Sequence, residues 1–310
     1  MLLVMCGFMT IIAHETSVRA HRTFETLVEL ATTANVADDI GLLHRAADTG
    51  GVYLALTTGT GLESYSNAVD GGWLTVEKFG YNPVVSASAR EDIWSLGLTY
   101  TGYLSAALPV RVQAGGNAAD TAAGAGARGV KIIGLDSDFD IIEETVATAG
   151  ASASALTVQP FIRVYRVQAS GVGGVYGTPG ANTGAITIES SGADVMAHIG
   201  ATLGQTEQTH YCVPAGYRAH LRHASTSVGE REASVELYQR AALPIVAPFA
   251  SKRIVHRWPA NLLSAEEYWE RGAIIFDEKT DLWGEAVGSS GAPSAVELSY
   301  TLELEPWVYI

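Results

Sequence analysis

The chain has 310 residues, of which 47% are hydrophobic and 17% are charged, with 33 glycines and 10 prolines. This length and apolar content suffice for one or two folded domains, which excludes disorder for most of the chain. The net charge of −14 would repel phosphate backbones, so direct packing against nucleic acid is disfavoured.

The first element is an apolar run over residues 1–12. It has no basic flank and is only about half as long as the ~20 residues that a membrane span needs. The sequence therefore predicts neither a signal peptide nor a transmembrane helix here. A first strand or buried arm is favoured over a tail that contacts lipid or a partner.

Helical spacing follows, on one stripe formed by Phe24, Leu27, Val28 and Ala31. A second short helix is predicted over residues 39–47, with Asp38 as its cap and a glycine pair beyond its end. We expect a partly helical extension over residues 1–72 that ends at Gly71 and Gly72.

From Trp73 onward the pattern changes to short apolar and β-branched runs bounded by turn residues. The runs lie at residues 74–76, 110–112, 130–133, 141–146, 161–167, 185–188, 217–223, 234–238, 273–276 and 296–304. Segments 114–129 and 170–184 are rich in glycine and alanine and should be long surface loops. About ten strands without intervening helices predict an antiparallel β-sandwich or jelly roll over residues 73–310.

Two motifs resemble ligand sites. Residues 124–129 (GAGARG) have dinucleotide-fingerprint spacing, with Glu144 about twenty residues later, but a strand follows where a helix is needed. Asp136, Asp138 and Asp140 alternate as in a calcium loop, but Ile141 stands at the required glycine position. An acidic hairpin turn between the flanking strands is the favoured interpretation.

Two further groups of residues have side chains that could bind a metal or act in catalysis. His210, Cys212, His220 and His223 could bind zinc, but their spacing favours ordinary sheet histidines. Glu266, Glu267 and Glu270 lie beside aromatic residues, as in a glycosidase, although a solvated turn is favoured. Cys6 and Cys212 do not form a disulfide framework. The sequence therefore predicts no cofactor, no metal and no enzymatic activity.

Several pieces, in one order after Trp73, carry a resemblance: residues 77–82 (EKFGYN), 91–94 (EDIW), 100–103 (YTGY), 117–128 (NAADTAAGAGAR), 134–136 (GLD), 161–163 (FIR), 182–188 (NTGAITI), 211–216 (YCVPAG) and 278–282 (EKTDL). Together they resemble a family of uncharacterised virion structural proteins of tailed bacteriophages, often marine ones. The likeness spans about three quarters of the chain, with Tyr81 where an arginine is common and Cys212 where a threonine is common. The first seventy residues have no counterpart in it.

The resemblance implies a non-enzymatic virion protein, which we expect on the capsid exterior as a decoration, cement or spike protein, and in the host cytoplasm during assembly. The expected partners are other copies of the chain, as a homo-oligomer such as a trimer, and the major capsid protein. Nucleic acid and membrane are not expected partners. The alternative is a host-attachment module of a head or tail fibre that binds surface glycans.

Aromatic residues dominate interface energies, so two clusters are candidate contact anchors. The first contains Trp94, Tyr100 and Tyr103, and the second contains Trp258, Tyr268 and Trp269. A position in the core is the alternative for each of the six.

Overall fold

The structure is a computed structural model. It describes strands within residues 2–64 and the chain over residues 73–306, except residues 175–179, 230–231, 246, 260–263 and 290–292. The chain divides into two compact units, Met1–Leu74 and Thr75–Ile310. The domain boundary predicted at Gly71 and Gly72 lies just before this division. Each unit is described by itself.

The first unit contains a six-stranded sheet in the order β1-β2-β3-β4-β5-β6. Its neighbouring strands are antiparallel except for the parallel pair β3 and β4. The strands are β1 (Leu2–Cys6), β2 (Met9–His14), β3 (Ser17–Phe24), β4 (Leu43–Ala46), β5 (Val52–Ala55) and β6 (Leu62–Ser64). The apolar run at residues 1–12 thus supplies most of a β-hairpin.

The predicted N-terminal helices are not seen among the described residues. Most of the first helical stripe lies outside them, and Phe24 ends strand β3. In the segment predicted as a helix over residues 39–47, Leu43–Ala46 forms strand β4, so that prediction is wrong for these four residues. Pairing with β3 and β5 on both sides satisfies the backbone of β4, which overrides a weak local helical preference.

The remaining strands form four sheets in the described part of the second unit. They are β7 (Leu74–Val85), β8 (Glu91–Asp92), β9 (Leu108–Val112), β10 (Ala127–Leu135), β11 (Ile141–Ala147), β12 (Pro160–Phe161), β13 (Arg163–Val172), β14 (Ile186–Ser190), β15 (Val195–Ile199), β16 (Tyr211–Cys212), β17 (Tyr217–Val228), β18 (Ala233–Ala241), β19 (Arg253–Trp258), β20 (Ser264–Tyr268), β21 (Ile275–Phe276), β22 (Thr280–Gly288) and β23 (Ser294–Pro306).

Two five-stranded sheets share the first core, and their orders are β16-β22-β18-β19 with β8 on β22, and β20-β17-β23-β7 with β21 on β17. Strand β23 shows how sequence sets this core, because every second residue from Val296 to Leu304 is buried. Each fully buried Leu or Ile of such a row contributes about 1.5–3 kcal/mol. Facing residues come from the other sheet, among them Val235, Leu237 and Leu282.

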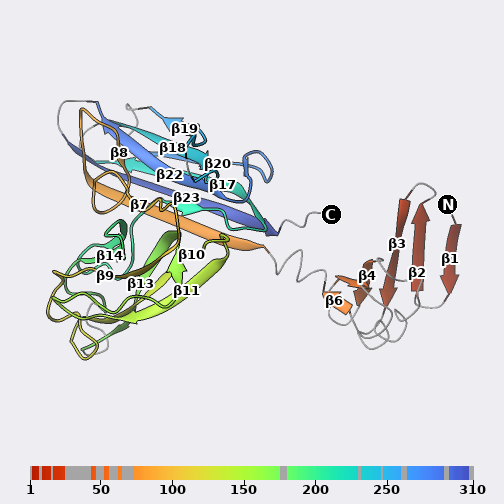
Figure 1. The fold of residues 1–310 in the computed structure, drawn as a ribbon. Coiled ribbons are helices and arrows are strands. Elements are labelled where there is room, and N and C mark those ends of the chain that lie inside the picture. Colours follow the sequence, from red (N-terminus) through yellow and green to blue (C-terminus); the bar gives the residue numbers. More distant parts are fainter. Residues whose placement is uncertain are drawn as a thin grey trace. The chain divides into compact units, whose positions relative to one another are not determined.

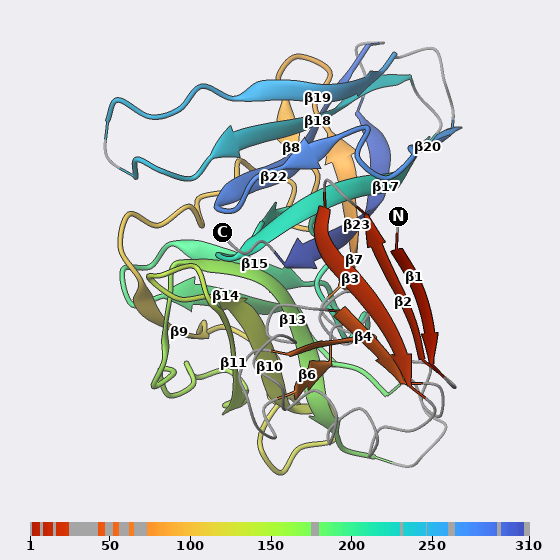
Figure 2. The same cartoon turned by 90° about the vertical axis from the view of Figure 1, so that its right-hand side faces the viewer.

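The other two sheets, in the orders β11-β10-β13 and β12-β9-β14-β15, share the second core. It contains Val130 and Ile132 of β10 and Ile186 and Ile188 of β14, all at most 2% exposed. Figure 1 shows the strands of the first core on one side of this unit and the yellow-green strands of the second core on the other. In Figure 2 the separation between β18, β19 and β22 and β9, β10 and β11 is again visible.

The buried residues of the first core belong to segments up to Ile93 and from Tyr211 onward. Most of those of the second core lie between Leu104 and Ile199. The second core is therefore built by a segment inserted into the chain of the first.

The prediction of an all-β, antiparallel body is confirmed, and no helix occurs among the described residues. Each predicted run from residue 74 to residue 304 overlaps a strand. The acidic hairpin is also found, since β10 and β11 pair antiparallel up to Leu135 and Ile141. The residues that the structure describes contain no helix long and apolar enough to cross a membrane.

Candidate functional site

An aromatic cluster lies where the two cores meet, and it consists of Trp94, Tyr100, Tyr103, His210 and Trp283. The Tyr100 and His210 rings stack with centroids 3.9 Å apart, and Trp94 and Tyr103 each meet Tyr100 edge to face, at 5.2 Å and 5.0 Å. Trp283 meets Tyr103 at 5.9 Å. Such edge and offset contacts are the favoured arrangements of aromatic rings.

Asp92 holds this cluster in place from strand β8. Its carboxylate accepts a hydrogen bond from the backbone N–H of Tyr100 at 2.8 Å and lies 3.3 Å from Nε2 of His210. The Tyr100 hydroxyl donates to the carbonyl of Met196, a residue of the second core, at 3.0 Å. The cluster therefore connects the two cores by packing and by hydrogen bonds.

A buried ion pair lies beside the cluster. Arg163 of β13 donates to the Asp281 carboxylate of β22 through Nε at 2.9 Å and Nη2 at 3.0 Å. Its Nη1 donates to the carbonyls of Leu104 and Ile162. Burial opposes the charge of Arg163, but Asp281 holds the pKa of the guanidinium above its ordinary value. The bidentate geometry fixes β13 against β22.

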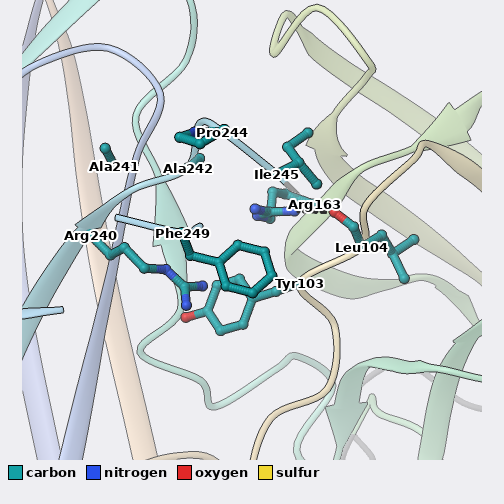
Figure 3. Close-up of a pocket in the computed structure, with 9 residues that line it drawn as sticks. All are labelled: Tyr103, Leu104, Arg163, Arg240, Ala241, Ala242, Pro244, Ile245 and Phe249. Carbon is teal, nitrogen blue, oxygen red and sulfur yellow. Dashed lines mark hydrogen bonds between the residues drawn. The ribbon is translucent and has the colours of Figure 1, made fainter. Parts of the chain in front are cut away.

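The arginine pocket, a cavity of about 170 Å³, opens next to this ion pair (Figure 3). Its walls include Tyr103, Leu104, Arg163, Arg240, Ile245 and Phe249, together with the start of the β18–β19 connection. Figure 3 shows Arg240, Phe249 and Tyr103 gathered together, with Arg163 donating to the Leu104 carbonyl. A cationic and partly apolar cavity of this kind can bind a small anion.

The phenols of Tyr100 and Tyr103 and the thiol of Cys212, near the cluster, stay protonated at neutral pH. Burial raises the pKa of the phenols of Tyr100 and Tyr103. It also raises the pKa of the Cys212 thiol well above its usual value. The two hydroxyls are therefore hydrogen-bond donors, and the thiol is not an activated nucleophile.

The six predicted contact anchors are divided between core and surface. Trp94, Tyr100 and Trp258 are at most 5% exposed, so these three cannot contact another molecule while the chain keeps this fold. Trp269 is partly buried and packs against the first core. Tyr103 borders the arginine pocket, and Tyr268 is 73% exposed.

Tyr268 lies next to a polar groove, here called the serine groove, of about 420 Å³ between β17, β20 and β23. The Tyr268 hydroxyl donates to Glu266 at 2.5 Å, and His223 contacts the same carboxylate oxygen at 2.9 Å. These two contacts lower the pKa of Glu266. The groove is lined by Ser225, Thr226, Ser227, Ser264, Ala265, Glu266 and Glu297.

The residues considered for zinc take separate partners. His210 contacts Asp92, His220 contacts Glu305 at 2.9 Å, His223 contacts Glu266, and Cys212 is a buried free thiol. Within the described residues, no group of three or more His, Cys, Asp or Glu side chains could hold a metal ion.

The acidic hairpin and the glycine motif have structural roles. Asp136 accepts hydrogen bonds from the backbone of Asp138 and Asp140 and so shapes the turn. In the glycine motif, a Cβ on Gly126 would lie 2.1 Å from the carboxylate of Asp120. Glu144 accepts from the backbone of residues 158 and 159.

The acidic residues Glu266 and Glu267 of strand β20 also have different partners. Glu266 binds Tyr268 and His223, while Glu267 lies 2.9 Å from His256. The two side chains alternate along β20 and so point to opposite faces of its sheet. These contacts do not form a pair of carboxylates that face one substrate.

Sequence reasoning did not single out Arg163, Arg240, Asp281 or Phe249, which form the ion pair and much of the pocket. One signal was available for Arg163. It interrupts an apolar alternating run at residues 161–167, where it shares a face with Phe161 and Tyr165. A charged residue on the apolar face of a strand indicates a buried partner.

No protein-family model matches the chain, and no curated protein matches it significantly.

Proposed function

We propose that the chain is a non-enzymatic structural protein of a tailed-phage virion. It would decorate, cement or form a spike on the capsid exterior as a homo-oligomer such as a trimer, bound to the major capsid protein. One observation carries this proposal: three of the segments that resemble the phage family each supply a buried polar side chain that holds backbone in place, namely Asp92, Asp120 and Asn182.

Asp120 and Asn182 illustrate this use of the resembling segments. The Asp120 carboxylate accepts three backbone hydrogen bonds, from residues 127, 183 and 184, each at 2.8 Å. The Asn182 side chain donates to two carbonyls and accepts from the backbone N–H of Gly204. Asp92, in a third segment, anchors the aromatic cluster. These side chains make the framework rigid, as a particle component requires.

The architecture supports the same role. We infer two stacked β-sandwiches, since each core lies between residues contributed by two sheets. The acidic charge favours the exterior over the DNA-facing interior. Exposed apolar side chains such as Val84, Leu98 and Val158 are candidates for contacts with neighbouring subunits. The first unit would extend to a neighbouring copy or to the shell.

The direct test is the composition of purified virions. We expect quantitative mass spectrometry to find this chain at a fixed copy number, and particle imaging to place an all-β density outside the shell. A chain missing from purified particles would overturn the proposal. Release of reducing sugar from host polysaccharide by the purified chain would refute its non-enzymatic part.

A second candidate function is attachment to a neutral host glycan, and the serine groove favours it. Tyr268 offers an exposed ring for stacking on a sugar, beside hydroxyl and carboxylate groups that can bind sugar hydroxyls. We expect neutral host polysaccharide to bind the wild type and the Phe249→Ala variant, and Tyr268→Ala to lose binding. Equal binding by all three proteins, or no binding at all, would end this candidate.

A further inference from the structure

The arginine pocket has an uneven charge. Among the described residues that line it, both ionised side chains are arginines, Arg163 and Arg240, and their shared counter-charge is the neighbouring carboxylate of Asp281. The chain as a whole carries a net charge of −14, so this cavity differs in sign from the net charge of the protein. A bound anion would therefore find favourable charge at this place.

Arg240 is the arginine of the pocket that has no hydrogen bond to the Asp281 carboxylate. Arg163 is already paired with Asp281 through two hydrogen bonds. Arg240 Nη2 lies 3.9 Å from the same carboxylate, which is beyond hydrogen-bond distance. Its guanidinium is held 4.9 Å from the ring centroid of Tyr103 and 5.6 Å from that of Trp283. Arg163 and Arg240 thus share the carboxylate of Asp281. The side chain of Arg240 is 29% exposed, and its guanidinium can donate hydrogen bonds to a ligand.

Tyr103 adds a neutral donor. Its hydroxyl oxygen is buried and has no hydrogen-bond partner among the residues that the structure describes. Buried polar atoms in proteins are normally paired, so this hydroxyl, which lies beside the cavity, has a hydrogen bond to donate to a molecule bound there. Burial also raises the pKa of this phenol, so it donates a proton and does not repel an anion.

The rest of the wall is apolar. Leu104, Ile245 and Phe249 contribute to it, and Phe249 is 61% exposed. The volume of about 170 Å³ is close to that of a cavity of roughly 150 Å³ that binds benzene. The pocket therefore accommodates one ring or a short branched chain together with an acidic group.

We propose that the arginine pocket binds a carboxylate attached to a small apolar group, with Arg240 and Tyr103 donating to the carboxylate and Phe249 covering the apolar part. This inference is independent of the proposed virion role. The same chemistry occurs in a free small acid and in the C-terminal residue of a neighbouring protein chain.

The test uses benzoate and its uncharged analogue benzamide, titrated into the full chain by calorimetry. We expect benzoate to bind in the millimolar range or tighter, and benzamide to bind at least about tenfold more weakly. Arg240→Gln should abolish benzoate binding and Tyr103→Phe should weaken it severalfold. Arg253→Gln, which alters an exposed arginine of β19, is the matched control and should bind as the wild type does.

Circular dichroism of each variant would establish that loss of binding is not loss of folding. A short peptide ending in phenylalanine with a free carboxylate, compared with its C-terminal amide, distinguishes the two sources. Tighter binding of the peptide acid than of benzoate indicates a chain terminus, and binding of benzoate alone indicates a free acid. If neither binds, or if folded Arg240→Gln binds benzoate as well as Arg253→Gln does, the proposal is wrong.

Discussion

Arg163 and Asp281 form a buried ion pair between the two cores, and Arg163 would be an uncompensated buried charge without Asp281. Their side chains are 7% and 1% exposed. A buried ion pair adds little to the free energy of unfolding compared with two apolar residues. The loss of one partner, however, lowers that free energy strongly, because the remaining charge stays buried. The pair therefore makes the relative position of β13 and β22 specific.

Replacing Asp281 with asparagine should lower the free energy of unfolding by about 3–5 kcal/mol, because Arg163 would remain buried without a counter-charge. Urea denaturation followed by circular dichroism measures the loss. The control is Asp277→Asn, since Asp277 is 78% exposed in its pair with Arg218 and should cost at most about 1 kcal/mol. Equal losses in the two variants would contradict this account of the ion pair.

His198 gives the protein a pH-dependent stability. Burial lowers the pKa of its imidazole below 6.5, and Ser95 lies 2.9 Å from its Nδ1. Below pH 6.5 the unfolded chain binds a proton that the folded chain takes up only at lower pH, so stability falls as the pH falls through this range. We expect His198→Gln to lose less stability than the wild type between pH 7 and pH 5.

The measurement is a set of urea titrations at closely spaced pH values. His256→Gln is a suitable comparison, because His256 faces the carboxylate of Glu267 at 2.9 Å rather than an uncharged hydroxyl. If the wild type and His198→Gln show the same slope of stability against pH, burial of His198 does not contribute to it.

The aromatic residues show how far sequence can predict a site. Residue type indicated that Trp94, Tyr100 and Tyr103 belong together, and the structure does bring them into contact. Residue type could not indicate that Trp94 and Tyr100 are buried and that Tyr100 contacts the second core, because this depends on strands distant in the sequence. The arginine pocket depends on the same long-range contacts, so only Tyr103 of its lining was anticipated.

At the scale of the elements, strand β22 is the most informative failure of the sequence pattern. The run TDLWGEAVG is buried along nearly its whole length, and it contains Asp281 and Glu285. Alternating strands such as β23 were predicted because one face is polar. Strand β22 is covered on both sides, so the pattern of its sequence does not alternate. Its two carboxylates are typical of a surface turn, but in the structure Asp281 pairs with Arg163 and Glu285 pairs with Lys252.

Gly284 is the residue that lets β22 lie so close to its neighbours. A Cβ there would be 2.4 Å from Leu298 and 3.2 Å from Ile93. We expect Gly284→Ala to lower stability by about 1–3 kcal/mol through overpacking. Gly171 of β13 has no atom within 4 Å of a built Cβ, so Gly171→Ala should be neutral or slightly stabilising. Thermal unfolding of both variants checks this, and a neutral Gly284→Ala would contradict the packing argument.

For the molecule as a whole, the division of the second unit into two cores was not predicted. Local patterns gave the strands, but the pairing of β7 with β23, from opposite ends of this unit, follows from no local signal. A body of turn-separated strands was expected to form one sandwich. The inserted strands β9 to β15 instead bury their own apolar faces against one another.

The connection through Arg163, Asp281 and the aromatic cluster should make the two cores unfold together. Leu298→Ala in the first core and Ile188→Ala in the second should each cost about 2–5 kcal/mol. We expect each variant to shift one common transition, measured by calorimetry and by tryptophan fluorescence. Two separate transitions, each shifted by only one of the variants, would show that the cores are independent.

The stacking of Tyr100 on His210 has a consequence for how such a protein can evolve. The centroids of these rings are 3.9 Å apart, so the chain leaves the first core and returns to it at nearly the same point. Parts of the intervening segment that do not include Tyr103 or Arg163 could be lengthened or exchanged without changing the strand order of the first core. Such changes would alter the surface around the second core while the strands of the first core keep their pairing.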